Sequence, residues 1–295
     1  MRRLFMVLAL PVLAACSAFD GWVAQPRKAT PQEQRQAIVA KTPSTPPVAA
    51  SAAAPASIRA SMPRGYLPEG GAPNSLDLLP APPASGSAAQ ARDDEAARAA
   101  QGMRDSLRWV QAVQDAELGF PAAAEAFSCA LDIEISQAAT PTLYRLLEQS
   151  MVDVGLSTYP TKNRYQRTRP FVVASTPSCT PAEEGFLRND GSYPSGHSAI
   201  GWGWALILAE AAPDRADDVL ARGRAFGQSR VICNVHWLSD TEEGRVVAAA
   251  TIAILHANAE FTSDLSAASR EITAARWAGQ RPRRDCEKEA AQLAK

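Results

Sequence analysis

Residues 194–212 read PSGHSAIGWGWALILAEAA, a run in which nearly every residue after Ser198 is apolar or small. Ser195 is a favourable N-cap residue, because its hydroxyl can accept from a free backbone N–H of the first helical turn. The stretch therefore predicts a strongly apolar helix over residues 197–212, which Pro213 follows.

The same kind of periodicity recurs along the chain after residue 93. In the first such segment apolar residues return at spacings of three and four, at Ala96, Ala99, Met103, Leu107, Val110 and Val113. Further helices are expected at residues 122–135, 142–156, 214–231, 236–258 and 264–278. Few runs show the alternation that a half-buried strand requires. The sequence therefore predicts an all-α fold with a single helical domain.

The N-terminus has the features of an export signal. Residues 1–16 read MRRLFMVLALPVLAAC, with two arginines, a short apolar segment and small residues before the cysteine. The last four letters resemble the lipobox of bacterial lipoproteins, in which Cys16 becomes the lipidated first residue of the mature chain. We therefore expect a lipoprotein-type signal peptide and a protein held in the periplasm or anchored in the outer membrane. The alternative is an ordinary cleaved signal with an incidental cysteine.

Two further regions follow this signal. Residues 17–64 are rich in Ala, Pro and Ser, and their apolar residues are small and aperiodic. Such a composition buries too little apolar surface to offset the entropy of ordering, so a flexible tether is expected. Residues 65–295 are expected to form the helical domain.

Charge and hydropathy disfavour two classes of protein. The 295 residues contain 30 Lys and Arg against 31 Asp and Glu, a formal net charge of −1. This balance gives no reason to expect a nucleic-acid partner. The longest apolar run in the domain, residues 246–255, is too short to cross a membrane as a helix. No transmembrane helix is therefore expected there.

Four cysteines remain once Cys16 is set aside. In an exported chain they can form two disulfides, with three ways of pairing. Cys179 and Cys233 flank the motifs described next, so their pairing is favoured, which leaves Cys129 with Cys286.

The first segment suited to chemistry runs from Lys162 to Pro170 and reads KNRYQRTRP. A basic run of this kind is, by itself, typical of a solvated face. The alternative is an anion cradle, because the guanidinium of Arg169 offers a planar fork that matches phosphate oxygens and Lys162 supplies a point charge. Arg164 and Arg167 lie between these two residues.

The second segment is GSYPSGH at residues 191–197. Gly196 lets the backbone approach a ligand closely, and the free N–H groups and dipole of a helix N-terminus favour an anion. The simpler interpretation is a helix cap with His197 on the surface. Ser195 is not expected to be a hydrolase nucleophile, because YPSGH differs from the G-x-S-x-G motif.

The third segment, residues 229–240, reads SRVICNVHWLSD. His236 and Asp240 are four residues apart, so on a helix both would lie on one face. An aspartate that accepts from one ring nitrogen fixes the tautomer and leaves the other nitrogen free as a nucleophile. The alternative is a buried structural pair.

A metal site formed by His197, His236 and Asp240 is a further alternative. It is disfavoured because the lysine and arginines of the three segments would surround it, repelling a metal ion and attracting an anion. No metal or other cofactor is therefore expected. The third histidine, His256, has no such neighbours and is interpreted as structural.

In chain order the segments read K-x6-R-P, P-S-G-H and S-R-x5-H-x3-D. This pattern resembles the signature of the type 2 phosphatidic acid phosphatase superfamily, with every signature position filled. Within that superfamily the chain is most similar to bacterial class A non-specific acid phosphatases, over about residues 65–280. The likeness extends to GSY before the second motif and to Cys233 and Trp237 in the third. Asp190 stands where that family usually has asparagine.

The resemblance implies an exported enzyme, with the helical core that this superfamily shares with vanadium haloperoxidases, that hydrolyses phosphate monoesters of broad range without a metal ion. It implies that His236 attacks phosphorus and that Asp240 orients it. It also implies that His197 protonates the leaving oxygen and then activates water. The groups implied to bind the phosphate oxygens are Lys162, Arg169, Arg230, Ser195 and Gly196. Phosphotransfer to alcohols is chemically open to such a phosphoenzyme.

Three other functions fit part of the pattern. A vanadate-dependent haloperoxidase shares these residues, but the small domain and the closer likeness to acid phosphatases argue against it. A membrane lipid phosphatase would need several spanning helices. A non-catalytic envelope lipoprotein that binds phosphate is disfavoured by the complete catalytic set. The oligomeric state is left open, and a homodimer would be unsurprising.

Overall fold

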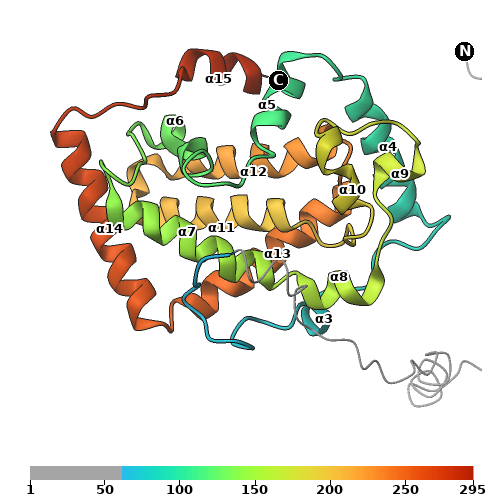
Figure 1. Cartoon of the computed structure of the whole chain (residues 1–295), viewed down its shortest axis with the longest axis horizontal. Coiled ribbons are helices and arrows are strands. Elements are labelled where there is room, and N and C mark those ends of the chain that lie inside the picture. The colour runs from blue at the N-terminus through green and yellow to red at the C-terminus, as the bar shows by residue number, and fades with distance from the viewer. Residues whose placement is uncertain (1–61, 295) are drawn as a thin grey trace, which may run out of the picture. The chain divides into compact units, whose positions relative to one another are not determined.

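The structure is a computed structural model that describes residues 62–294. The expected signal peptide, the lipidation site at Cys16 and residues 17–61 of the expected tether lie outside the described residues. Within 62–294 the secondary structure consists of helices, and no strand is present (Figure 1). The prediction of an all-α fold is confirmed.

Within residues 62–294, eight helices have eight or more residues, and shorter turns connect them. The longer ones are α4 (Ala88–Gln101), α5 (Leu107–Gln114), α7 (Pro141–Leu156), α11 (Gly196–Ala211), α12 (Ala216–Ile232), α13 (Leu238–Leu255), α14 (Ala259–Trp277) and α15 (Cys286–Leu293). The shorter ones are α3 (Ser75–Leu78), η1 (Ala124–Phe127), α6 (Ser128–Leu131), α8 (Tyr159–Tyr165), α9 (Pro170–Val173), η2 (Pro181–Glu183), α10 (Glu184–Leu187) and η3 (Pro213–Arg215).

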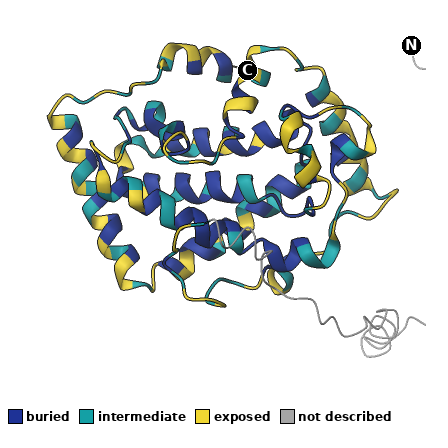
Figure 2. Ribbon diagram, viewed as in Figure 1, coloured by how far each residue is buried: buried dark blue, intermediate teal, exposed yellow. Residues whose placement is uncertain are grey.

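Helix α11 lies at the centre, packed against α12, α13 and α7 (Figure 1). It is apolar on all sides, as a fully surrounded helix should be, and most of its residues are buried (Figure 2). Two glycines permit the close contact with α12. A Cβ on Gly223 would lie 2.4 Å from the Cβ of Ala205, and one on Gly201 would overlap the ring of Phe226. The stretch at 194–212 therefore forms the predicted helix and positions its neighbours.

The core is made of aromatic and aliphatic side chains from α7, α11, α12 and α14, with η1 and α6 covering one end. Trp204 is its largest fully buried side chain, and its indole N–H donates to the carbonyl of Leu147 at 2.9 Å. Its ring meets Phe127 and Phe226 edge-on. A buried indole needs such a partner, so this contact fixes α11 against α7.

The apolar periodicity after residue 93 gives a different result from the one expected. It forms two helices, α4 and α5, because residues 102–106 interrupt it and Ser106 caps a new helix through its hydroxyl. The apolar residues of the second half, namely Met103, Leu107, Val110 and Val113, are all exposed by more than 40%. The spacing identified helix correctly, but it did not identify a buried face.

Two disulfides link segments far apart in the sequence. Cys179 pairs with Cys233, and Cys129 pairs with Cys286. The favoured pairing is therefore confirmed. The second bond holds α15, near the C-terminus, against α6.

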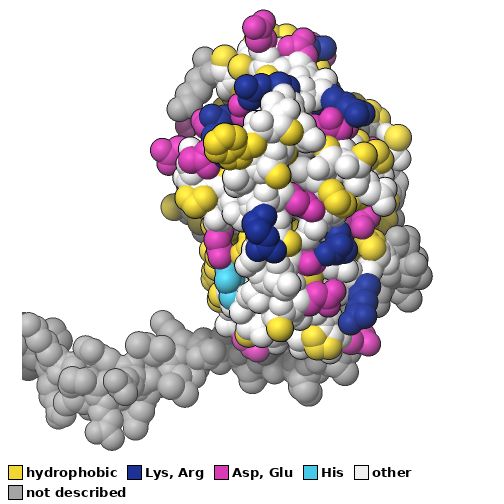
Figure 3. All heavy atoms as spheres, turned by 90° about the vertical axis from the view of Figure 1, so that its left-hand side faces the viewer, with side chains coloured by type: hydrophobic (Ala, Val, Ile, Leu, Met, Phe, Trp, Pro, Cys, Tyr) yellow, Lys and Arg dark blue, Asp and Glu magenta, His cyan; other side chains and the backbone are white. Residues whose placement is uncertain are grey.

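The surface carries both signs of charge. On the face in Figure 3, basic and acidic side chains are interspersed. Ion pairs between partly exposed side chains include Arg276 with Asp214 at 2.7 Å and Arg281 with Asp132 at 2.8 Å. Among residues 62–294 no single helix has the length and hydropathy to cross a membrane. Helices α13 and α14 would meet that test only together, and they bend by 99° at their junction.

Candidate active site

The three motif segments lie at one end of the central helix. The first contributes α8 and the residues that lead into α9, the second ends at the start of α11, and the third joins α12 to α13. The backbone N–H of Ser195 donates to the carbonyl of Asp240 at 2.9 Å, which ties the second segment to the third. Gly244 allows this approach, because a Cβ there would lie 2.6 Å from the carbonyl oxygen of Ser195.

His236 and Asp240 are paired, but not on one helix as expected. Helix α13 begins at Leu238, with Trp237 as its N-cap. Asp240 is in the first turn, and its Oδ2 accepts from the backbone N–H of Trp237 at 2.8 Å, as a capping carboxylate does. The same oxygen lies 3.2 Å from Nδ1 of His236. The four-residue spacing brings His236 and Asp240 together because the carboxylate that caps α13 also contacts the imidazole.

The partners of His236 fix its tautomer. Nη1 of Arg169 lies 3.0 Å from Nε2, and a guanidinium can only donate. Nε2 must therefore carry a lone pair, and Nδ1 must carry the proton that faces Asp240. His236 is only 2% exposed. A neutral imidazole with its lone pair at Nε2 is the form that can act as a nucleophile.

Two residues that the sequence did not single out hold Asp240. Oδ1 of Asp240 accepts from Arg167 at 2.6 Å, and Oδ2 accepts from the hydroxyl of Ser192. The other guanidinium nitrogen of Arg167 bonds Asp93, on α4, at 2.7 Å. Arg167 is thus a partly buried bridge that fixes the aspartate, whereas the sequence offered it only as a residue between Lys162 and Arg169.

Lys162 and Arg169 converge on a third charge. Nζ of Lys162 and Nη2 of Arg169 each lie 2.9 Å from Oδ2 of Asp190. Lys162 also donates to the carbonyl of Gly191. Both cations are buried, at 3% and 2% exposure. The two predicted cations are together, and a carboxylate joins them.

Arg230 differs from both. Its side chain is completely buried on α12, and none of its three guanidinium nitrogens has a hydrogen-bond partner among the described residues. Burying a charged group without partners is costly, so such an arginine calls for an anion. Its neighbour in the motif, Ser229, faces the other way and donates to Asp115 at 2.5 Å.

The start of α11 supplies the remaining predicted groups. Ser195 is the N-cap, and its Oγ accepts from the N–H of Ser198 at 3.2 Å and from the hydroxyl of the same residue at 2.9 Å. Gly196 is the first helical residue. A Cβ there would meet only Thr158, with its Oγ1 at 3.8 Å. Packing within the chain therefore does not require a glycine at this position.

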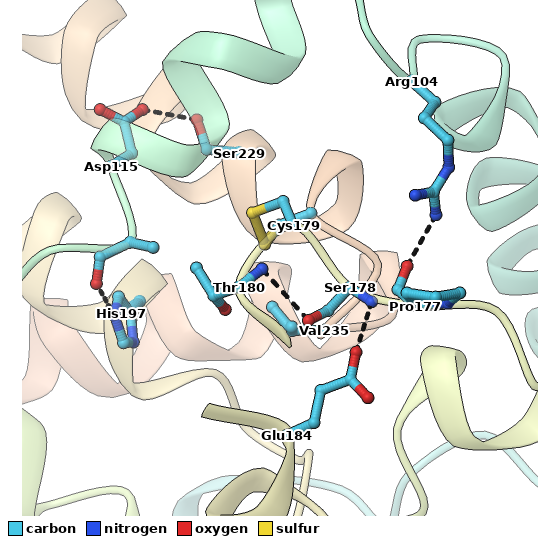
Figure 4. The surroundings of a disulfide bond; sticks show 12 residues. Arg104, Asp115, Pro177, Ser178, Cys179, Thr180, Glu184, His197, Ser229 and Val235 are labelled. Carbon is cyan, nitrogen blue, oxygen red and sulfur yellow. Dashed lines mark hydrogen bonds between the residues drawn. A yellow bond between two sulfur atoms is a disulfide. The ribbon is translucent and has the colours of Figure 1, made fainter. Parts of the chain in front are cut away.

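His197 is held by a backbone carbonyl from a distant segment. Its Nε2 lies 2.9 Å from the oxygen of Ala116, so Nε2 carries the proton and Nδ1 is left free (Figure 4). Ala116 follows Asp115, which is bonded to Ser229 in the same view. The disulfide between Cys179 and Cys233 lies beside this pair in Figure 4 and joins the segment after α9 to the end of α12.

Burial and charge keep both imidazoles neutral. Burial is the larger cause that holds the pKa of His236 well below its usual range, and the positive charges of Arg169, Lys162 and Arg230 add to it. The pKa of His197 is lowered by burial and by the same three cations, although the Ala116 carbonyl acts in the opposite direction. Three cations that act on both rings indicate a compact positive site.

Burial also lowers the pKa of the Arg230 guanidinium, to about 10, which leaves it charged at neutral and acid pH. The donor set therefore favours an anion. No group of three or more His, Cys, Asp or Glu suited to a metal ion is found in the described part of the chain.

Comparison with known proteins shows the family to which the chain is similar. The PAP2 superfamily matches residues 145–262, which include all three motifs. The chain is 39% identical to an acid phosphatase of Zymomonas mobilis, over 70% of this chain and 78% of the relative. It is 40% identical to a non-specific acid phosphatase of Providencia stuartii, over 70% and 84%, and to one of Salmonella typhimurium, over 68% and 80%.

The chain belongs to the PAP2 superfamily. Within it, the chain belongs to the acid phosphatases that these bacterial relatives represent, so it is a phosphatase.

Proposed function

We propose that this acid phosphatase hydrolyses a broad range of phosphate monoesters through a phosphohistidine on His236, without a metal ion. The observation that carries the proposal is the neutral imidazole of His236, held at Nδ1 by Asp240, with its lone pair in a cluster of buried cations.

The nucleophile is Nε2 of His236. Its lone pair forms a bond to phosphorus while the bond from phosphorus to the ester oxygen breaks, and that oxygen keeps the electron pair. The imidazole gains positive charge in this step, and the Asp240 carboxylate 3.2 Å from Nδ1 stabilises it. Arg167 keeps the carboxylate in place through its 2.6 Å bond.

The proton for the leaving oxygen comes from His197. Because Nε2 donates to Ala116, the catalytic proton is on Nδ1. The lowered pKa of His197 means that the free enzyme holds no such proton at neutral pH. A bound phosphate ester offsets the three cations that lower this pKa, and acid conditions supply the proton, so we expect activity on the acid side of neutrality. In the second step Nδ1 takes a proton from water while the water oxygen bonds to phosphorus. The bond from phosphorus to Nε2 of His236 breaks, and Nε2 recovers its lone pair.

The phosphoryl oxygens are bound by Arg230, Lys162 and Arg169, together with the Ser195 hydroxyl and the Gly196 N–H. The transition state of phosphoryl transfer spreads charge over three oxygens, so fixed donors supply most of the rate acceleration. Arg230 contributes most, since all its donors are unpartnered among the described residues.

The test is turnover of p-nitrophenyl phosphate by the purified protein, with and without EDTA. We expect equal activity in both, and inhibition by vanadate, whose five-coordinate form resembles the transition state. Loss of activity on chelation that a divalent cation restores would contradict the metal-independent mechanism.

His197 is tested by the choice of leaving group. In His197→Ala we expect a far greater loss of kcat/KM for alkyl phosphates than for p-nitrophenyl phosphate, because nitrophenolate leaves without a proton. General acid catalysis contributes roughly 10²–10⁴-fold, and the alkyl esters should lose a factor in this range. Equal losses for both substrates would remove His197 from this role.

We further propose export to the periplasm and an outer-membrane lipid anchor on Cys16. The support is the sequence of residues 1–16. Metabolic labelling with palmitate in a bacterial host should label the wild type and not Cys16→Ser. Label on both, or on neither, would contradict the anchor. A homodimer is also proposed, and sedimentation equilibrium of the purified protein would test it.

A further inference from the structure

Asp190 lies at the centre of the proposed phosphate site. Its side chain is 12% exposed, and its Oδ2 accepts from both Lys162 and Arg169 at 2.9 Å. An acceptor oxygen shared by a lysine and an arginine is the contact that a phosphoryl oxygen would make with the same pair. The carboxylate and the substrate therefore need the same donors.

The hydrogen bonds of Arg169 show which of its donors a ligand could use. Each of its five N–H groups faces an acceptor within the chain, and a ligand can replace only some of these acceptors. Nε donates to the carbonyls of Leu187 and Asp190, Nη1 to the carbonyl of Val235 and to His236, and Nη2 to the carboxylate of Asp190 with the carbonyl of Gly191 at 3.5 Å. The bonds to Leu187 and Val235 fix the arginine. The contacts with His236 and Asp190 are the ones that a phosphoryl group at Nε2 can replace.

The charges lead to the same result. Among the side chains around the proposed phosphate position, Lys162, Arg169 and Arg230 are positive and Asp190 is negative, so these four groups carry an excess of two positive charges. Asp240 belongs to a separate network, in which Arg167 pairs with both Asp240 and Asp93. That excess matches a doubly charged phosphate monoester, and it avoids the stronger retention of phosphate that a site with three uncompensated cations would show.

We propose that Asp190 is a specificity- and affinity-setting residue that competes with phosphate for Lys162 and Arg169 and so promotes release of the inorganic phosphate product. This inference rests on the proposed function of the site. It assigns to Asp190 a role opposite to that of the cations beside it, because its charge weakens anion binding while its hydrogen bonds keep the two cations oriented.

The direct test is Asp190→Asn, which retains an acceptor oxygen and the shape of the side chain but removes the charge. We expect the inhibition constant for inorganic phosphate, measured against p-nitrophenyl phosphate at fixed pH, to fall about tenfold or more. The matched control is Glu183→Gln. It removes the same charge from the same segment, at an exposed residue whose negative charge also acts on Arg230. We expect less than about a threefold change in the control.

A second measurement separates charge from shape. Binding of tetrahedral sulfate, with two charges, and perrhenate, with one, is measured by calorimetry in both variants and the wild type. We expect Asp190→Asn to gain more affinity for sulfate than for perrhenate. Weaker binding of both anions would show that Asp190 is only structural and would overturn the proposal, as would an equal gain in Glu183→Gln. Asp190→Ser, judged in the same way, replaces the asparagine variant if thermal unfolding shows that the latter is misfolded.

The same experiments distinguish this proposal from the proposed function. Calorimetry with sulfate and phosphate tests Asp190 whether or not the wild type turns over a substrate. An inactive wild type would contradict the proposed function alone. An active wild type with no gain in Asp190→Asn would contradict the role of Asp190 alone.

Discussion

Helix α12 carries two buried arginines, Arg222 and Arg230, whose environments are opposite. Arg222 is 3% exposed and is bonded to Asp115, with Glu289 of α15 at 3.3 Å. Arg230 is fully buried and has no hydrogen-bond partner among the described residues. The same residue type on the same helix is therefore a structural ion pair at one position and a group poised for an anion at the other.

On α12, the arginine that stabilises the fold and the arginine available to a ligand are therefore different residues. The Arg222 cluster joins α5, α12 and α15, and it fixes Asp115, the residue before the carbonyl that orients His197. Its charged groups form ion pairs within the chain. At Arg230 the guanidinium has no hydrogen-bond partner among the described residues, so the folded chain bears a cost that an anionic ligand would relieve, which is the usual sign of a functional site.

The largest effect is expected on stability, from Arg222→Met. Removing this cation leaves Asp115 and Glu289 as buried carboxylates without their main partner, and breaking a buried pair in this way costs about 3–5 kcal/mol. Urea unfolding should show this loss. The folded fraction should keep kcat/KM within about tenfold of the wild type. An unchanged unfolding free energy would remove the structural half of the comparison.

The next effect is expected on catalysis, from Arg230→Met. Loss of one fixed donor to the transition state should lower kcat by about 10²–10³, or roughly 2.7–4 kcal/mol. Stability should stay level or rise, because an unpartnered buried charge is removed. Arg230→Lys, which keeps the charge without the planar fork, is the matched control and should lose less. A strongly destabilised Arg230→Met with nearly normal kcat would reverse the comparison.

The smallest effect is expected on the pH dependence of stability. Both histidines of the candidate site have a lowered pKa in the folded protein, whereas the unfolded value is about 6.5. Below about pH 6.5 the unfolded chain binds protons that the folded site does not accept, so the folded state loses stability as pH falls. Above about pH 6.5 the full contribution of these two histidines to folding stability is present.

The measurement is thermal unfolding of the wild type and of a His197→Gln, His236→Gln variant between pH 5 and 8. We expect the wild type to lose more stability than the variant on the acid side. Asp153 is present in both proteins, so its contribution cancels when their stabilities are compared. Alone, this carboxyl would act in the opposite sense, because burial raises its pKa to about 6. Parallel curves would mean that the two imidazoles titrate normally.

Much of the architecture could be predicted because it depends on local pattern. The apolar run at 194–212 specified the central helix, and the proline-bounded periodic segments specified most of the others. The direction of each helix face could not be predicted in the same way: the spacing of Met103, Leu107, Val110 and Val113 is helical, and these residues are exposed. Which face of a helix is covered depends on its neighbours, and periodicity alone does not contain that information.

The site divides in a similar way. The motifs brought Lys162, Arg169, His197, Arg230 and His236 to one place, as their residue types predicted. The groups that set their protonation could not be found, because they arrive through tertiary contacts. The partner of His197 is a backbone carbonyl, and a carbonyl leaves no trace in the sequence. The contrast between Arg222 and Arg230 depends on Asp115 and Glu289, which are distant in the chain.

The central claim is that His236 carries the phosphoryl group. The most direct test is rapid quenching into base of the enzyme reacting with a phosphate monoester, followed by mass spectrometry of its peptides. We predict a phosphoryl group that is stable in base and labile in acid on His236, and its absence in His236→Ala. A reacting enzyme without a phosphopeptide, or with the phosphoryl group on another residue, would contradict the account.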